Sequence, residues 1–200
     1  MLDWNTQASQ SAPHLMPSVE ATGILVGTSI ATSFGWRPIE AICCGDMVLT
    51  FDHGFRSVVG VRRVLLWDGR GECPKALRSV RIGANVLDNT QDVDVLPEQG
   101  IMVESDAAVD YRGDPFAVLM PRSMEAYGFA DIVEQSLPTE AVVLEFEDDE
   151  VVYGQSGLHF HIPKAGDLFV EVDPALQYKV LNTEETFELL EDLNAAHQQQ

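Results

Sequence analysis

Between residues 24 and 162, short runs rich in β-branched and aromatic residues are separated by glycine, aspartate and proline. Short runs bounded by turn residues are typical of β-strands. The segments 33–35, 52–54 and 67–69 each end in glycine, which accepts the positive φ of a hairpin turn. The regular spacing predicts an all-β domain whose sheets close or fold over one another. The expected strands span residues 24–32, 37–42, 47–51, 57–66, 78–82, 116–120, 140–146, 151–153 and 157–162.

Two later segments favour helices. Between residues 121 and 135 the apolar spacing and the share of helix formers predict one short internal helix, which Gly128 weakens. Near the end of the chain, Asn182 and Glu185 have the spacing of a capping box. An apolar stripe among acidic residues follows, formed by Phe187, Leu189, Leu190 and Leu193. We expect a C-terminal amphipathic helix that packs either on its own domain or in a partner's groove.

The charge balance limits the partners that the chain can attract. Twelve Lys and Arg residues stand against 32 Asp and Glu residues, a formal net charge of −20. Such a surface repels phosphate backbones and anionic lipid headgroups, so nucleic acid and membrane are excluded as expected partners. A protein with a basic surface is favoured instead. With 46% hydrophobic and 22% charged residues, the chain has the composition of a packed domain rather than of a disordered acidic segment.

The cysteines and the N-terminal residues indicate the compartment. Three cysteines are an odd number, and the neighbours Cys43 and Cys44 are expected to be reduced, small core residues, as is usual for free cysteine. The longest uncharged run, 21–36, is shorter than the roughly 20 apolar residues of a membrane span. Residues 1–22 are mostly polar and interrupted by two prolines, lack a leader signature and are predicted to form a flexible arm. We expect a cytoplasmic protein by default, with non-classical export left open, and no cofactor.

One block of the sequence carries a family resemblance. Residues 27–32 read GTSIAT, residues 35–40 read GWRPIE and residues 45–54 read GDMVLTFDHG. Their order and spacing are similar to the bacterial stand-alone branch of the Hint (Hedgehog/intein) domains, and weaker similarity continues to about residue 162. The resemblance implies a pseudo-symmetric fold of β-hairpins. We therefore divide the chain into an arm (1–22), a Hint-like domain (23–165) and a C-terminal extension with the acidic helix (166–200).

The resemblance also implies a set of catalytic positions. In active members a cysteine at the first Hint residue attacks the preceding carbonyl, and a histidine of a Ser-Pro-x-His segment hydrogen-bonds the scissile amide. Gly23 stands at the first position and Gln99 at the second, and Asp149 stands where a later histidine often occurs. Glycine has no nucleophile, and glutamine does not transfer protons near neutral pH. With Thr50 and His53, these residues are expected to form a relic cleft, so we predict a scaffold that is inactive in self-cleavage and splicing and has no catalytic residues.

Two alternatives remain open at this point. The first is a self-processing domain with a rearranged threonine nucleophile, Thr22 or Thr28, although Thr22 lies one position too early in the strand. The second is a metal-binding β-protein, because His159 and His161 lie on one face of an expected strand. The acidic run 145–150 is expected to be a solvated hairpin tip rather than a cation site.

Overall fold

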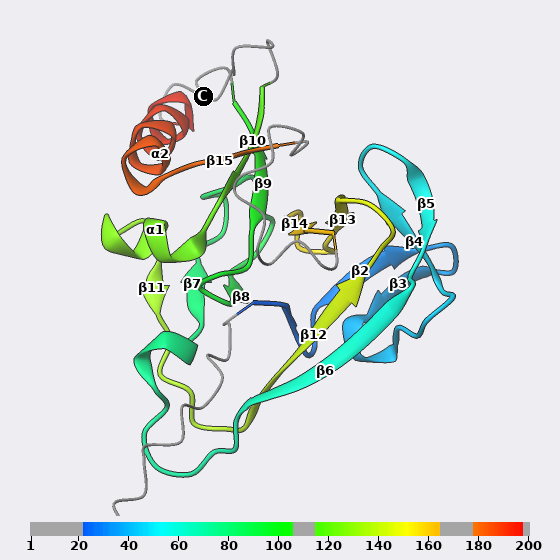
Figure 1. Ribbon diagram of the computed structural model, residues 1–200. Helices are drawn as coiled ribbons and strands as arrows, with labels where there is room; N and C mark the ends of the chain where they lie inside the picture. The colour runs from blue at the N-terminus through cyan, green and yellow to red at the C-terminus, as the bar shows by residue number, and fades with distance from the viewer. Residues whose placement is uncertain (1–21, 106–114, 165–177, 198–200) are drawn as a thin grey trace, which may run out of the picture.

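The computed structural model describes residues 22–105, 115–164 and 178–197 (Figure 1). The predicted arm, apart from Thr22, lies outside these residues. The strands are β1 (Ile24–Leu25), β2 (Ser29–Thr32), β3 (Gly35–Pro38), β4 (Met47–Thr50), β5 (Gly54–Ser57), β6 (Gly60–Trp67), β7 (Val80–Ile82), β8 (Val93–Val95), β9 (Ile101–Glu104), β10 (Phe116–Leu119), β11 (Asp131–Ile132), β12 (Thr139–Glu145), β13 (Glu150–Tyr153), β14 (His159–Ile162) and β15 (Lys179–Val180). The α-helices of the described segments are α1 (Pro121–Ala126) and α2 (Thr183–His197), and 3₁₀ turns span Ile39–Ala41 and Lys75–Leu77. The protein is therefore mostly β, as the sequence predicts.

The strands form three sheets. The largest has nine strands in the order β15-β10-β9-β14-β13-β4-β2-β3, with β5 added to β4. A second sheet has the order β1-β12-β6, and a third has the order β11-β7-β8. Within the described residues β1 and β8 are each the last strand of their sheet, and both lie near the centre of the molecule (Figure 1). The sheets therefore meet around the start of the predicted domain.

Glycines fix two of the three predicted turns. Gly35, with φ 89°, closes the hairpin of β2 and β3, and Gly54, with φ 67°, closes that of β4 and β5. The expectation of a hairpin at 67–69 is wrong, because β6 pairs with the distant β12 instead of the strand that follows it. Gly69 does adopt a positive φ of 81°, but the long antiparallel pairing of β6 with β12 prevents a local hairpin.

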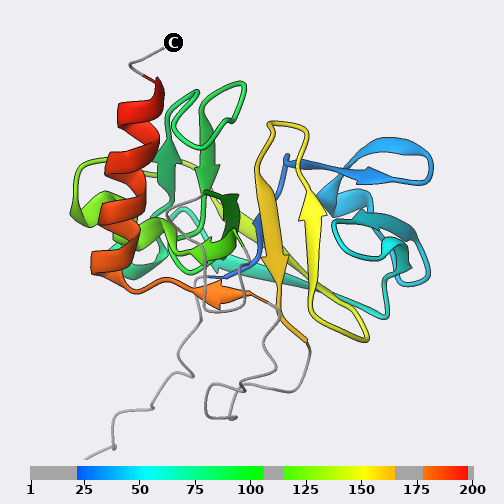
Figure 2. The same ribbon diagram turned by 90° about the horizontal axis from the view of Figure 1, so that it is seen from above.

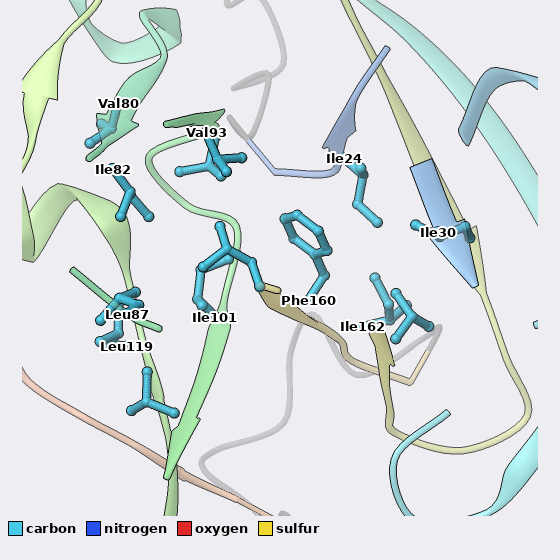
Figure 3. Close-up of a cluster of buried hydrophobic side chains, with 14 of the residues drawn as sticks. Ile24, Ile30, Val80, Ile82, Leu87, Val93, Ile101, Leu119, Phe160 and Ile162 are labelled. Atoms are coloured by element: carbon cyan, nitrogen blue, oxygen red, sulfur yellow. The ribbon is translucent and has the colours of Figure 1, made fainter. Parts of the chain in front are cut away.

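One hydrophobic core joins the sheets. Phe160 of β14 is 1% exposed and lies between Ile101 of β9 and the pair Ile24 and Ile30 of β1 and β2 (Figure 3). The same cluster includes Leu189 and Leu190 of α2. Ile24, which follows Gly23, and Val95 and Ile101, which flank the β8–β9 loop, belong to this core. Gly23 and the loop are therefore held in place by packing between many strands.

Both helices have identifiable ends. The internal helix was expected between 121 and 135, but α1 stops at Ala126 and Gly128 follows with φ 77°, a conformation that ends helices. At α2, Asn182 Oδ1 accepts the N–H groups of Glu184 and Glu185, and Glu185 Oε2 accepts the N–H of Asn182. The rings of Tyr127 and Phe187 lie 4.5 Å apart. The apolar stripe of α2 therefore packs on its own domain, at the opposite end of the molecule from the β4–β5 hairpin (Figure 2).

The expectation that Cys43 and Cys44 are core residues is wrong. Both side chains are exposed, whereas Cys73 is buried, and all three thiols are free. The segment between the first 3₁₀ turn and β4 runs along the surface. The side chain of Ile42 packs into the core, whereas those of Cys43 and Cys44 are exposed to solvent. No described helix is long and apolar enough to cross a lipid bilayer.

Candidate functional site

Gly23 begins the site, directly before β1. It is buried, and its φ of 111° lies in the region that favours glycine. A Cβ built there would lie 3.0 Å from Val143 Cγ2 and 3.1 Å from the carbonyl oxygen of Val142. A side chain at this position therefore requires both an unfavourable backbone conformation and a shift of β12.

Gln99 meets the backbone of Gly23 from the loop between β8 and β9. The side chain is 2% exposed, and its Oε1 accepts the N–H of Gly23 at 3.0 Å. Its Nε2 donates to the carbonyl oxygens of Gly100 at 3.0 Å and of His161 at 2.8 Å. Because the N–H of Gly23 only donates and the two carbonyl oxygens only accept, these partners fix the orientation of the amide. Gln99 thus joins three segments that are distant in the sequence.

The direction of the Gly23–Gln99 hydrogen bond determines the chemistry available there. The nitrogen of Gly23 belongs to the Thr22–Gly23 peptide bond, and it acts as the donor. An acceptor holds an amide nitrogen in its ordinary planar, protonated form, whereas general acid catalysis requires a group that gives a proton to the leaving nitrogen. Since both Nε2 protons are engaged by carbonyls, Gln99 has no proton directed at this bond.

Thr50 and His53 lie in a different part of the molecule, at the β4–β5 hairpin. Thr50 is buried, and its Oγ1 donates to the carbonyl of Gly54 at 3.0 Å. His53 Nδ1 lies 3.2 Å from Glu150 Oε2. Within the described residues, neither side chain forms a hydrogen bond or ion pair with Gly23 or Gln99. The expected single cleft is therefore divided: Gly23 contacts Gln99, and the hairpin residues form a network of their own.

Glu150 is the residue that the sequence interpretation missed. Its side chain has no exposed surface, and Arg56 Nε lies 3.1 Å from its Oε1, opposite His53. Glu147 and Asp148 are exposed, as a hairpin tip predicts, but Glu150 and Phe146 are buried. The expectation for the whole run 145–150 is therefore wrong at these two residues. Pairing of β13 with both β4 and β14 covers Glu150, and strand pairing of this kind has no signal in an acidic run.

Asp149 lies beside the end of β14. Its Oδ1 accepts the N–H of Lys164 at 2.5 Å. Burial lowers the pKa of His161 below its ordinary value, and the Asp149 carboxylate opposes that shift. Asp149 is therefore linked to Gln99 only indirectly, since Gln99 contacts the backbone carbonyl of His161.

The two histidines of β14 lie among aromatic rings. The ring of His159 is 4.9 Å from that of Tyr153 and 6.3 Å from that of Phe51, and the ring of His161 is 6.1 Å from that of Tyr178. Burial lowers the pKa of His159 as well. In the part of the chain that the structure describes, no three side chains of His, Cys, Asp or Glu come together as metal ligands would. The geometry supports aromatic packing for this pair.

Comparison with known proteins finds a family match and several solved structures of limited similarity. A family model described as a Hint domain matches residues 22–156. No curated protein matches the chain. Among solved structures, a bacterial intein-like domain from Clostridium thermocellum is 14% identical over 70% of this chain and 98% of its own, with a TM-score of 0.43. The AceL NrdHF class 3 split intein is 18% identical over 72% and 98%, with a TM-score of 0.35. The gp41-1 intein is 15% identical over 68% and 97%, with a TM-score of 0.41.

Proposed function

Because this chain belongs to the Hint domain family, we propose that it keeps the fold as a scaffold for binding another protein and does not cut or splice its own backbone. The observation that carries the proposal is the hydrogen bond from Gly23 N to Gln99 Oε1. It places an acceptor, with no free proton, at the one peptide bond where the family resemblance implies cleavage.

Two separate chemical requirements are unmet at this bond. Covalent catalysis needs a nucleophile, and Gly23 has no side chain to supply one. Acid catalysis at the leaving nitrogen, a contribution of about 10²- to 10⁴-fold, needs a proton donor, and Gln99 accepts instead. The absence of a nucleophile at Gly23 alone removes the covalent route. The absence of a proton donor at Gln99 is a second, independent obstacle.

The backbone at residue 23 supports the same conclusion. Its φ of 111° and the close approach of Val142 and Val143 suit glycine. A site that acted through a side chain here would need room for a Cβ, and β12 would have to shift by a few tenths of an ångström to provide it. This fit to glycine supports the proposal that residue 23 has no catalytic side-chain role.

A basic protein is the partner that the charge favours. With a formal net charge of −20, the surface attracts cationic proteins and repels anionic ones, which raises the rate of encounter with the former.

The intact mass of the freshly purified protein tests the proposal. We expect a single species with the mass of the complete chain, unchanged after incubation with dithiothreitol or hydroxylamine, which cleave thioesters and esters. Any species that begins between Thr22 and Ser29 overturns the proposal and favours a threonine nucleophile. In that case Thr22→Val and Thr28→Val identify which hydroxyl reacts, because only the reacting one abolishes the product.

A further inference from the structure

A groove of about 960 Å³ lies next to the site, between the sheet of β1 and β12 and the sheet of β7, β8 and β11. One wall is the turn from β1 to β2 and the start of β12, and the other is the segment leading into β8 together with residues 133–136. The edge strands β1 and β8 contact each other where the two sheets meet, near the centre of the molecule (Figure 1). Its volume is at the upper end of the usual range for ligand sites, about 300–1,000 Å³, and the groove is open to solvent.

The lining of the groove is acidic. Asp92, Asp94, Glu134 and Glu140 line it, against the single cation Arg81. Arg81 is already neutralised, because its Nε and Nη2 donate to the two carboxylate oxygens of Asp94 at 2.7 and 2.9 Å. Asp92 accepts the N–H of Ala84, and Glu134 lies 3.8 Å from Arg78 Nη1, outside the lining. The four carboxylates still outnumber the one cation of the lining, which favours a positively charged occupant.

Ser156 provides an independent indication of a ligand. It lines the same groove and is 6% exposed, yet its Oγ has no hydrogen-bond partner within the described residues. Its backbone carbonyl accepts the N–H of Thr90, whereas the hydroxyl has no such contact in the described part of the chain. Buried hydroxyls nearly always have a partner, so an unpartnered one in the lining points to an occupant of the groove.

We propose that this groove binds an extended, lysine- or arginine-rich segment of a partner protein, with Glu134 and Glu140 contacting its cations and Ser156 its backbone. The proposal rests on the proposed scaffold function and assigns its binding site. A protein segment is favoured over a compact cation, because the lining also includes the apolar residues Leu25, Val133 and Leu137. The basic side chains of a peptide can then meet carboxylates while its apolar ones meet these residues.

A fluorescent peptide of alternating lysine and valine, titrated with the complete protein at low salt, tests the proposal. We expect saturable binding that Glu134→Lys with Glu140→Lys weakens by at least about tenfold. The matched control is Glu188→Lys with Glu191→Lys, which changes the net charge equally on exposed positions of α2 and should weaken binding no more than about twofold. Equal weakening by both pairs, or an absence of binding to the wild-type protein, overturns the proposal.

Three further measurements separate the site from general charge attraction. Hydrogen exchange should slow in residues 91–94 and 133–136 when the peptide binds. Ser156→Ala should weaken binding without lowering the thermal midpoint, because the free protein loses an unpartnered hydroxyl. If spermine, added at the same concentration of positive charge, displaces the peptide, the groove does not require a protein segment and the proposal is wrong. If the protein stays unprocessed but does not bind the peptide, only the proposed binding site is wrong. If a product beginning near Gly23 forms, the proposed scaffold function is wrong whatever the groove binds.

Discussion

Gln99 Oε1 lies 3.0 Å from the backbone nitrogen of Gly23, a hydrogen bond that spans 76 residues of sequence. The Nε2 of the same side chain donates to Gly100 and His161, so one buried amide connects β1, β9 and β14. Gln99 therefore serves as a structural link between these segments. Its removal should lower the free energy of unfolding.

Replacement of Gln99 by leucine tests the structural role. Gln99→Leu keeps the approximate volume but leaves the N–H of Gly23 and the carbonyl of His161 without the Gln99 amide in a buried site, whereas the carbonyl of Gly100 still accepts the N–H of His161. Each buried unsatisfied group costs about 1–3 kcal/mol, so we expect the free energy of unfolding in urea to fall by at least about 2 kcal/mol. Gln155→Leu, at an exposed glutamine, is the control and should change little. Equal stability of the two variants would show that Gln99 does not hold these segments together.

Glycine at residue 23 is tested against a second glycine of similar conformation. Gly23 and Gly27 have φ values of 111° and 95°, but a Cβ at Gly27 meets no atom within 4 Å. Both alanine variants should therefore bear the backbone cost, about 1–2 kcal/mol. Gly23→Ala should bear about 1–3 kcal/mol more, because Val142 and Val143 must move.

Chemical denaturation of the two glycine variants gives the comparison. If Gly27→Ala is as destabilised as Gly23→Ala, the contact with β12 has no energetic consequence, and residue 23 accommodates a Cβ as easily as residue 27.

The buried carboxylate of Glu150 provides a third test. Glu150→Gln removes the charge that faces both His53 and Arg56, and we expect a loss of about 1–3 kcal/mol on unfolding, a value reduced because Arg56 is partly exposed. Glu147→Gln is the matched control: its carboxylate is mostly exposed and 3.9 Å from Arg56 Nη2, and it should change stability by less than about 0.5 kcal/mol. A similar loss of stability in both variants would mean that the burial of Glu150 does not strengthen its ion pairs.

The strands and the contact at residue 23 show what the sequence alone could predict. Alternating short runs and glycine turns predicted the hairpins β2–β3 and β4–β5, because each depends on local turn chemistry. The ordered motifs of residues 27–54 identified the family, and the same alignment assigned Gln99 to the position that faces the amide of residue 23. The capping box at Asn182 was also readable, since all its atoms belong to four consecutive residues.

The predictions that the structure overturned depend on long-range packing, which local patterns do not encode. Glu150 differs from Glu147 only in the strands that cover it, and Cys43 differs from Ile42 only in which side of a surface segment meets the core. The turn at Gly69 does not make a hairpin because β6 extends along β12, whose residues lie more than 70 positions later. The acidic groove also requires two sheets to meet, and residues 25–29, 91–94 and 133–140 share no sequence feature that predicts it.

The histidines of β14 predict how stability depends on pH. Burial lowers the pKa of both His159 and His161 in the folded state, with Asp149 opposing the shift at His161. The unfolded chain, in which histidine titrates near 6.5, therefore binds more protons than the folded one as the pH falls below that value. The histidine contribution to stability is complete above pH 6.5 and is lost as the pH falls toward the lower folded-state values. Urea unfolding of the wild-type protein and of His161→Gln between about pH 5 and pH 7.5 measures it, and the wild type should lose more stability over this window than the variant. Parallel pH profiles for the two proteins would show that His161 accepts a proton as readily in the folded state as in the unfolded one.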